Sequence, residues 1–410
     1  MKEVFVGLIN KNVPLANMDF QWWNPTRIIF GEGKVQNLAG DLDLDWNFDD
    51  KEKVIIVTDE GVKNAGLLDY LLDGLKGSSR DVVAVFDKVL EEADREQVYE
   101  IAQLAVETKP DLWIALGGGS VMDACKAAAV IESNGGDLED YVGLYLVEEE
   151  TKPIICIPTT AGTGSEVTWG AVIMDRREKK KLIIGDYKFI PKVAVLDPEL
   201  TRTLPAHLVA ATGLDTLTHA IGGIVSVDRQ DFSSSMALRA IEMVADNLED
   251  AYHDNATNLE VRSKMLIAAC MGGIAFQTAL PGADHGIGHT AGAIYPIQHG
   301  IAGGITNLYV MEHNMPEVAH IYASVARALG VKDEGLSDET LGMKGIEVLR
   351  DLYSRVGIKL TYKDYGFPTD DETIEQLIEE SMDDPCMAFN PVGISRTPEF
   401  ENLVRKCVGV

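Results

Sequence analysis

LWIALGGGS occupies residues 112–120 of the chain. Its first five residues are all apolar, as in a strand that is buried on both faces of a parallel sheet. Three glycines and a serine follow, and residues 121–130 then form a helix-like stretch. A strand, a glycine turn and a helix in this order are typical of the α/β class, in which helices cover a parallel sheet.

The same pattern extends on both sides of this stretch, between residues 53 and 197. Short apolar runs alternate there with amphipathic helical segments, which indicates a largely parallel sheet. We expect its strands at residues 54–58, 82–86, 112–116, 154–157 and 193–196. Parallel sheets bind ligands at the carboxyl ends of their strands, so polar residues just after these runs are candidate site residues.

The second half of the chain has a different pattern. After residue 205 the strand signals fade, and runs with helical periodicity dominate, such as 236–248, 261–276 and 318–329. A chain of 410 residues is also long enough to expect two domains. We therefore expect an α/β N-terminal domain with a parallel Rossmann-like sheet, residues 1–203, and an all-α C-terminal domain, residues 204–410.

Composition restricts the partners and the compartment. The formal net charge of −29 would repel phosphate backbones and anionic lipid head groups, so we expect no nucleic acid partner. The five cysteines are odd in number and scattered, which indicates reduced thiols. The apolar run at residues 5–9 is too short for a signal-peptide core, and 18 apolar residues never run together. We expect a cytoplasmic protein that does not enter a membrane.

The glycine loop after residue 116 is a candidate phosphate site. Glycines allow close backbone approach, and the amino end of a helix offers unpaired N–H groups and a dipole that favours anions. Ser120 is positioned in sequence to cap this helix. The spacing is not GxGxxG and the loop follows the third expected strand, so a plain tight turn is the alternative.

A second donor-rich loop, PTTAGTGSEV, occupies residues 158–167 and also follows an apolar strand. Its hydroxyl and amide groups suit phosphates and ribose hydroxyls, although an ordinary polar turn is possible. Two such loops at neighbouring strands favour a dinucleotide. At the end of the first expected strand, Asp59 could accept hydrogen bonds from ribose hydroxyls and repel a 2′-phosphate, which favours NAD over NADP; a turn or helix-cap role is the alternative.

The histidines carry the second signal. Asp215 and His219 are four residues apart, as are His285 and His289, so each pair shares one face of a helix. His299 follows 14 residues after His285. One carboxylate with three imidazoles suits divalent iron or zinc and leaves a position open for a substrate oxygen, whereas calcium prefers more oxygens.

Coincidence is the alternative for these residues. A lone histidine is more often a packed or surface residue, and spacings of four residues are frequent. Asp284, directly before His285, is expected either to support a neighbouring group or to lie at the surface. We expect no role beyond surface or packing for the four other histidines, at positions 207, 253, 313 and 320.

Taken together, these segments resemble the iron-containing alcohol dehydrogenase family, a branch of the dehydroquinate synthase-like superfamily. The likeness covers nearly the whole chain, and its motifs are specific in combination. The matching segments are NPTRIIFGEG (24–33), GGGSVMD (117–123), TTAGTGSEVT (159–168), ATGLDTLTHA (211–220), the histidines at 285, 289 and 299, DPC (384–386) and NP (390–391).

The resemblance implies roles for individual residues. Asp215, His219, His285 and His299 match the metal ligands, and His289 matches a non-ligand histidine beside the nicotinamide that takes part in proton transfer. Asp59 matches the position that disfavours NADP. Lys181 matches a lysine near the nicotinamide ribose, although by itself it looks like a solvated lysine in Lys179-Lys180-Lys181. The two loops match the cofactor contacts and give the remaining candidates: Gly117, Gly118, Gly119, Ser120, Asp123, Thr159, Thr160 and Ser165.

The chain departs from the family pattern at several positions. Gly222 stands where Glu is common, Thr290 stands where Pro is common, and residues 279–284 differ from the usual apolar lead-in. About 18 residues precede the usual start. None of these changes removes a ligand, but they leave the substrate open.

The sequence therefore predicts an NAD-dependent, metal-dependent alcohol dehydrogenase or aldehyde reductase that uses Fe²⁺ or Zn²⁺. Its substrate would be a small primary alcohol or short aldehyde of the diol, lactaldehyde or sulfoacetaldehyde type. A zinc-dependent glycerol dehydrogenase, a dehydroquinate synthase-like lyase and a non-catalytic nucleotide- or metal-binding protein are the alternatives. Residues 268–311 contain no Lys or Arg, which disfavours the lyase. Enzymes of this size often form symmetric dimers, so we expect a homodimer or higher homo-oligomer.

Overall fold

The computed structural model describes residues 20–44, 48, 51–254 and 257–410. These residues form two compact units, Asn24–Leu204 and Pro205–Val410, and residues 20–23 group with the second. Phe20 and Trp22 make ring contacts with Phe232 of that unit, at centroid distances of 6.2 and 5.2 Å. The division into domains 1–203 and 204–410 stays a prediction; the two compact units differ from it in the placement of residues 20–23 and of Leu204, which groups with the first unit.

A six-stranded sheet forms the centre of the first unit. Its strand order is β1-β9-β6-β4-β2-β3, and every neighbouring pair is parallel. The expected α/β class with a parallel sheet is confirmed. The strands in chain order are β1 (Arg27–Phe30), β2 (Lys53–Val57), β3 (Asp81–Phe86), β4 (Leu112–Gly117), β6 (Ile154–Pro158) and β9 (Val193–Leu196).

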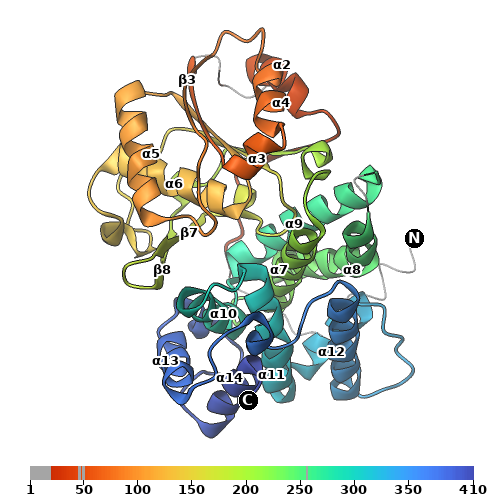
Figure 1. The fold of residues 1–410 in the computed structure, drawn as a ribbon. Helices are drawn as coiled ribbons and strands as arrows, with labels where there is room; N and C mark the ends of the chain where they lie inside the picture. The colour runs from red at the N-terminus through yellow and green to blue at the C-terminus, as the bar shows by residue number, and fades with distance from the viewer. Residues whose placement is uncertain (1–19, 45–47, 49–50, 255–256) are drawn as a thin grey trace. The chain divides into compact units, whose positions relative to one another are not determined.

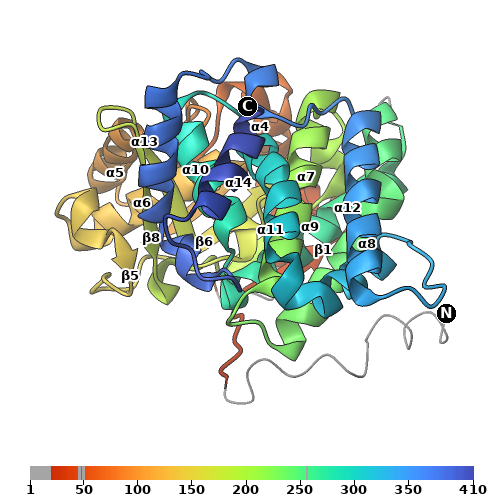
Figure 2. The same cartoon turned by 90° about the horizontal axis from the view of Figure 1, so that it is seen from below.

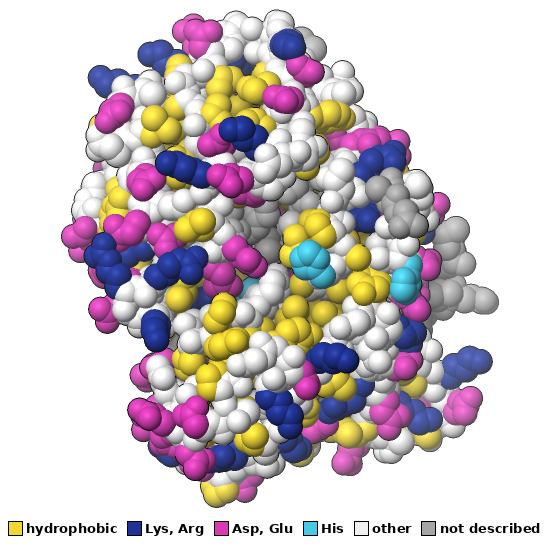
Figure 3. Space-filling view, viewed as in Figure 1, with side chains coloured by type: hydrophobic (Ala, Val, Ile, Leu, Met, Phe, Trp, Pro, Cys, Tyr) yellow, Lys and Arg dark blue, Asp and Glu magenta, His cyan; other side chains and the backbone are white. Residues whose placement is uncertain are grey.

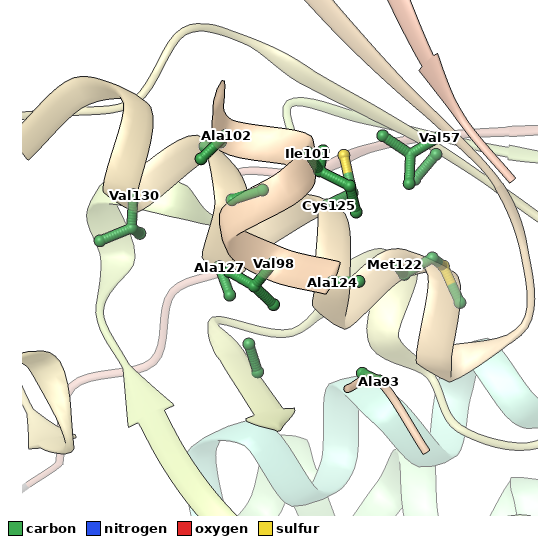
Figure 4. Close-up of a cluster of buried hydrophobic side chains, with 14 of the residues drawn as sticks. Val57, Ala93, Val98, Ile101, Ala102, Met122, Ala124, Cys125, Ala127 and Val130 are labelled. Atoms are coloured by element: carbon green, nitrogen blue, oxygen red, sulfur yellow. The ribbon is translucent and has the colours of Figure 1, made fainter. Parts of the chain in front are cut away.

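Helices cover both faces of this sheet, which explains why its strands are continuously apolar. On β4, Trp113 and Ala115 pack with α5 and α6, whereas Ile114 and Leu116 pack with α2, α3 and α4. Figure 1 shows the two helix layers on opposite sides of the strands, and Figure 4 shows α5 and α6 side chains in the first cluster. The helices are α2 (Leu38–Leu44), α3 (Glu60–Asn64), α4 (Leu67–Gly74), α5 (Arg95–Thr108) and α6 (Gly119–Asn134).

Four strands of this unit were not expected. The first is β1, at the edge of the sheet, where Ile28 and Phe30 are each 42% exposed. The other three form a small separate sheet of order β5-β8-β7. They are β5 (Gly143–Leu144), β7 (Gly170–Asp175) and β8 (Lys180–Gly185), and β7 and β8 are antiparallel.

The second unit is helical throughout its described residues, as expected. α11 packs against α7, α10 and α12, and α7 also packs against α8 and α9; Figure 2 shows this group of helices. The helices are α7 (Ala206–Val225), α8 (Asp231–His253), α9 (Leu259–Ala279), α10 (Ala283–Ile294), α11 (His299–Ala328), α12 (Asp338–Arg355), α13 (Asp371–Met382) and α14 (Pro398–Val408).

α7 is the core helix of this unit. It is long and apolar enough to cross a membrane by length and composition, but 94% of that window is buried inside the protein. A buried helix that is apolar on most sides is what the centre of a helical unit requires. Acidic and basic side chains are interspersed over the face of the protein shown in Figure 3.

Candidate active site

α7 supplies two of the expected metal ligands. Asp215 and His219 lie one helical turn apart, and both are buried. Their side chains point the same way, with 3.7 Å between His219 Nε2 and Asp215 Oδ1. The ring of His219 stacks on Phe276 of α9 at a centroid distance of 4.2 Å, which fixes its plane. The spacing of four residues therefore produces the shared face that the sequence predicted.

α10 supplies His285 and His289. The chain bends by 105° between α9 and α10, so α10 crosses the end of α9 instead of continuing it. Leu280 makes this turn with a φ of 59°, a conformation that is uncommon for a residue with a side chain. The ring of His285 stacks on that of His219 at 4.8 Å, which places α10 against the face of α7 that carries Asp215.

α11 begins at His299, the fourth expected ligand. Gln298 caps the helix by accepting a hydrogen bond from the backbone N–H of Ile301. At the next position, Gly300 lies so close to α7 that a Cβ there would overlap the carbonyl oxygen of Ala211. This approach brings His299 Nε2 to within 3.5 Å of Asp215 Oδ1.

The four side chains form one cluster that fits a divalent metal ion. Asp215, His219, His285 and His299 each offer a ligand atom, and these atoms lie within 4.8 Å of one another. A tetrahedral ion with bonds of about 2.1 Å has ligand–ligand edges of about 3.4 Å, close to the 3.5 and 3.7 Å separations at Asp215. His285 Nε2 is buried and has no hydrogen-bond partner among the described residues, as a ligand atom would.

Negative charge surrounds His285. Burial alone would lower the pKa of this imidazole, but the hydrogen bond and charge of Asp284, with further contributions from Asp215 and Asp384, raise it overall. The same electrostatic potential favours any cation at this position, so it also favours a metal ion. The negative charge around the cluster and its donor atoms therefore both favour a bound metal ion.

His289 lies beside the cluster and has a different partner. Its Nδ1 donates a hydrogen bond to Asp384 Oδ2 at 3.0 Å, and its ring stacks on His299 at 5.2 Å. Burial opposes the charge on Asp384, but His289 and the backbone N–H of Cys386 lower the pKa of this carboxyl to about 2. The carboxylate thus holds the proton on Nδ1 and orients the ring. A histidine that acts as a general base is often oriented by a carboxylate in this way.

His289, Asp384 and Cys386 also lie close enough together to be considered as a metal group. Burial, with the nearby charge of Asp384, raises the pKa of Cys386 well above its ordinary value. A protonated thiol is a poor ligand, because the thiolate is the form that binds metals. This second group is therefore the weaker metal candidate.

In the α/β unit, the two predicted loops meet. A Cβ on Gly118 would lie 3.2 Å from Thr160 Cγ2, and one on Gly119 would lie 2.6 Å from Thr163 Cγ2. A side chain at position 119 would require Thr163 to move, and one at position 118 would be in tight contact with Thr160. The backbone N–H of Thr159 also donates to the carbonyl oxygen of Gly117 at 3.0 Å. The structure therefore joins the glycine loop and the Thr-rich loop at one place, beyond the ends of β4 and β6.

The amino end of α6 at this place fits an anion. Its N-cap is Gly118, no side chain caps it, and its first turn carries no acidic residue. Thr160 Oγ1 is buried without a hydrogen-bond partner among the described residues. Unpaired N–H groups, a helix dipole and an available hydroxyl are the donors that a pyrophosphate requires.

The expected capping role of Ser120 is wrong. The helix begins one residue before it, and its hydroxyl accepts a hydrogen bond from the backbone N–H of Glu92 at 3.0 Å. Glu92 also pairs with Lys181, with 3.0 Å between Lys181 Nζ and Glu92 Oε2. The side chain of Lys181 is only 7% exposed, so it is not the solvated lysine that its neighbours suggest. Nothing in the sequence around Glu92 indicated this contact.

Asp123 and Ser165 contact each other. Ser165 Oγ donates to Asp123 Oδ1 at 2.6 Å and accepts from Lys126 Nζ at 2.8 Å. Lys126 is fully buried, and the sequence analysis missed it; a lysine within the apolar stretch after Asp123 was the available signal. Burial raises the pKa of nearby Glu166 to about 7. These side chains hold the Thr-rich loop against α6.

Asp59 follows β2 directly and caps α3. Its Oδ1 accepts a hydrogen bond from the backbone N–H of Val62 at 2.8 Å. Burial raises its pKa from the ordinary value, although these helix N–H groups oppose the shift. Asp59 is thus a helix cap, as the alternative expected. Its carboxylate also lies at the carboxyl end of a strand, which is where parallel sheets bind ligands such as a ribose.

The fold and the Asp/His cluster define a metal-dependent dehydrogenase of the α/β-plus-helical type. Residues 25–198 match the model for "Iron-containing alcohol dehydrogenase", and residues 209–406 match "Fe-containing alcohol dehydrogenase family, C-terminal". The chain belongs to the iron-containing alcohol dehydrogenase family, and it is an oxidoreductase of the class that acts on CH–OH groups.

Relatives of the chain are similar over nearly its whole length. It is 34% identical to the NAD-dependent methanol dehydrogenase of Bacillus methanolicus, covering 90% of this chain and 94% of that one. It is 31% identical to the NADPH-dependent butanol dehydrogenase of Clostridium saccharobutylicum, covering 90% and 92%. The structure of sulfoacetaldehyde reductase from Bifidobacterium kashiwanohense in complex with NAD+ superposes with a TM-score of 0.84 at 30% identity, covering 96% and 100%.

Proposed function

We propose that this enzyme interconverts a small primary alcohol and a short aldehyde, of the diol, lactaldehyde or sulfoacetaldehyde type, with NAD(H) and Fe²⁺ or Zn²⁺ as cofactors. The observation that carries the proposal is the cluster of one carboxylate and three imidazoles, of which all but the partly exposed His299 are buried. In this cluster His285 Nε2 has no hydrogen-bond partner among the described residues. A divalent ion held by these three nitrogens and one oxygen can bind a substrate oxygen by expanding to five ligands.

Asp215, His219, His285 and His299 hold the metal ion in this proposal. When bound, the ion supplies a Lewis acid for the alcohol or carbonyl oxygen, and the nicotinamide supplies or accepts the hydride. The protein contributes the geometry: α7, α10 and α11 bring four ligand atoms together in a buried position where water is largely excluded. Whether iron or zinc is resident depends on metal supply as well as on the ligands.

His289 is the proton carrier in this proposal. Asp384 accepts the proton on Nδ1, which leaves Nε2 as the basic nitrogen of the ring. This nitrogen can take a proton from the alcohol side of the reaction and pass it to solvent. Loss of His289 should therefore lower kcat by roughly 100-fold or more, within the usual range for a general base.

The nucleotide is NAD(H) in this proposal. The amino end of α6, with Gly117, Gly118, Gly119 and Ser120, binds the pyrophosphate, and the Thr-rich loop contributes Thr159 and Thr160. Asp123 and Ser165 support that loop. The carboxylate of Asp59 binds ribose hydroxyls and repels a 2′-phosphate. Lys181, held by Glu92, lies near the nicotinamide ribose.

The relatives support a small substrate, because the names of three of them refer to methanol, butanol and sulfoacetaldehyde. We further propose that the enzyme is cytoplasmic and acts as a homodimer or higher homo-oligomer, without nucleic acid or membrane partners. The net charge of −29 is consistent with that environment.

Metal-loaded turnover tests the proposal. The protein is purified without oxygen, its metal content is measured, and NADH oxidation is followed with short aldehydes after loading with Fe²⁺ or Zn²⁺. The reverse reaction is assayed with diols and glycerol. We expect metal bound near one equivalent, turnover with at least one aldehyde, and a clear preference for NADH over NADPH.

Variants of α7 provide a matched control. Asp215→Ala should abolish both metal binding and turnover, whereas His207→Ala, at an exposed position of the same helix, should change neither. Wild-type protein that binds neither metal and oxidises no NADH under any loading would contradict the proposal.

A further inference from the structure

Asp284 is a buried carboxylate, and both of its oxygens accept hydrogen bonds. It is the second residue of α10, directly before His285, and it is 2% exposed. Its Oδ1 accepts hydrogen bonds from the backbone N–H groups of Gly282 and His285, at 3.1 and 2.7 Å. Its Oδ2 accepts from Asn307 Nδ2 at 3.1 Å. Burying a charge is costly unless it is hydrogen-bonded, so this site is built to hold a carboxylate.

The same Oδ1 contacts the imidazole of His285. His285 Nδ1 lies 3.2 Å from Asp284 Oδ1, and a carboxylate can only accept, so Nδ1 carries the proton. The lone pair of the ring is then on Nε2. That nitrogen is buried without a hydrogen-bond partner in the described part of the chain, and it belongs to the cluster formed with Asp215, His219 and His299.

Gly222 makes room for this carboxylate. A Cβ at position 222 would lie 2.6 Å from Asp284 Oδ2 and 3.4 Å from its Cγ. The next residue of α7, Gly223, is different, because a Cβ there would lie no closer than 3.4 Å to Phe276, which is ordinary contact. A side chain at position 222 would therefore collide with the carboxylate of Asp284, whereas one at position 223 would not.

These contacts connect all three helices that supply the ligands. Asp284 itself is on α10 with His285, Gly222 is on α7 with Asp215 and His219, and Asn307 is on α11 with His299. A hydrogen-bonded carboxylate that sets the tautomer of a ligating histidine also increases its basicity.

We propose that Asp284 is a positioning residue of the metal centre, which holds His285 with Nε2 towards the metal and is itself held between α7 and α11 by Gly222 and Asn307. This inference rests on the proposed metal site. It gives Gly222, a departure from the family pattern, a structural reason, and it specifies which neighbouring group Asp284 supports.

Metal binding without turnover is the test. Co²⁺ is titrated into metal-free wild type, Asp284→Asn, Gly222→Ala and Gly223→Ala, and its visible spectrum and its affinity against a competing chelator are measured. Asp284→Asn keeps the size of the side chain and removes the charge. Loss of such a supporting group typically weakens metal binding by roughly 10- to 100-fold. We expect that loss and an altered Co²⁺ spectrum for Asp284→Asn and Gly222→Ala, with Gly223→Ala like the wild type.

NADH binding, followed by fluorescence, should be the same in all four proteins, and an unchanged helical circular dichroism signal with a cooperative thermal transition shows that each is folded. If Asp284→Asn fails to fold, Gly222→Ala carries the test by itself. If the variants at positions 222 and 284 bind Co²⁺ with wild-type affinity and an unchanged spectrum, the inference is overturned but the proposed function is not. Wild-type protein that binds no Co²⁺ at this cluster would overturn the proposed function, and the inference with it.

Discussion

Replacing Gly300 with alanine should separate His299 from Asp215. A Cβ at position 300 would overlap the carbonyl oxygen of Ala211 and lie 3.0 Å from both the carbonyl carbon of Ala211 and Asp215 Cβ. Ordinary contacts begin at 3.4 Å, and the shortest of these contacts is to the helix backbone at Ala211, which cannot rotate away. The start of α11 must therefore move by on the order of 1 Å from α7.

That displacement matters because His299 is the adjacent residue. The present separation of 3.5 Å between His299 Nε2 and Asp215 Oδ1 is already about the length of one edge of a tetrahedral site. If this separation grew by about 1 Å, His299 could no longer reach the metal ion, and Asp215, His219 and His285 would remain as its protein ligands. We expect a stability loss of about 1–3 kcal/mol from overpacking and a fall in turnover of roughly 100-fold from the misplaced group.

Gly303→Ala is the matched control on the same helix. A Cβ at position 303 would meet only Thr218, at 3.4 Å or more, so this variant should resemble the wild type. Metal content after dialysis, the Tm with and without added Zn²⁺, and NADH oxidation are measured for all three proteins. The wild type and Gly303→Ala should gain Tm on metal addition, because an ion that binds only the folded state stabilises it. Equal metal retention and turnover in Gly300→Ala would refute the reasoning.

Three further outcomes follow from the pKa shifts and from Asp59. The pKa of Asp384 is lowered from 3.8 to about 2, so the ionised carboxylate stabilises the folded protein above pH 4, and this contribution disappears towards pH 2. Asp384→Asn should therefore lower the free energy of unfolding by about 2 kcal/mol at pH 7 and make the Tm less dependent on pH between pH 4 and pH 2. The pKa of Glu166 is raised from 4.5 to about 7, so stability falls as pH rises through this range, and Glu166→Gln should recover up to about 3 kcal/mol at pH 8 in denaturant titrations. Asp59→Ser should increase kcat/KM for NADPH relative to NADH, and an unchanged ratio would contradict the ribose contact.

The sheet was predictable mainly because its central strands, β4, β6 and β9, are buried along their whole length. Every residue of β4 is buried, so the sequence signal is a continuous apolar run, and the five expected strands all occur in the central sheet. β1 was missed because it is short and half-exposed at the edge. The small sheet was missed because β7 and β8 flank a charged turn and β5 has only two residues. β1 and β5 are short strands that are held by tertiary contacts, and such strands leave little local signal.

The candidate site was predictable where its residues lie close together in sequence. The pairs at 215 and 219 and at 285 and 289 follow from helix geometry alone. Asp384 meets His289 across 95 positions, and Asn307 meets Asp284 across 23. No periodicity connects such residues, because the packing of different helices brings them together. The burial of Lys181 beside Glu92 is of the same kind.

The position of β1 in the sheet has a consequence for the synthesis of the chain. Arg27 of β1 pairs with Val193 of β9, 166 positions later, and β9 is its one neighbour in the described sheet. A ribosome that adds 5–20 residues per second needs on the order of 10–30 s to cover this distance. During that time β2, β3, β4 and β6 can already associate, whereas Ile28 and Phe30 have no strand to join. Among the strands of the described sheet, β1 is thus made first and can pair with its neighbour only last, and a strand of four residues offers little edge for pairing with other chains in the meantime.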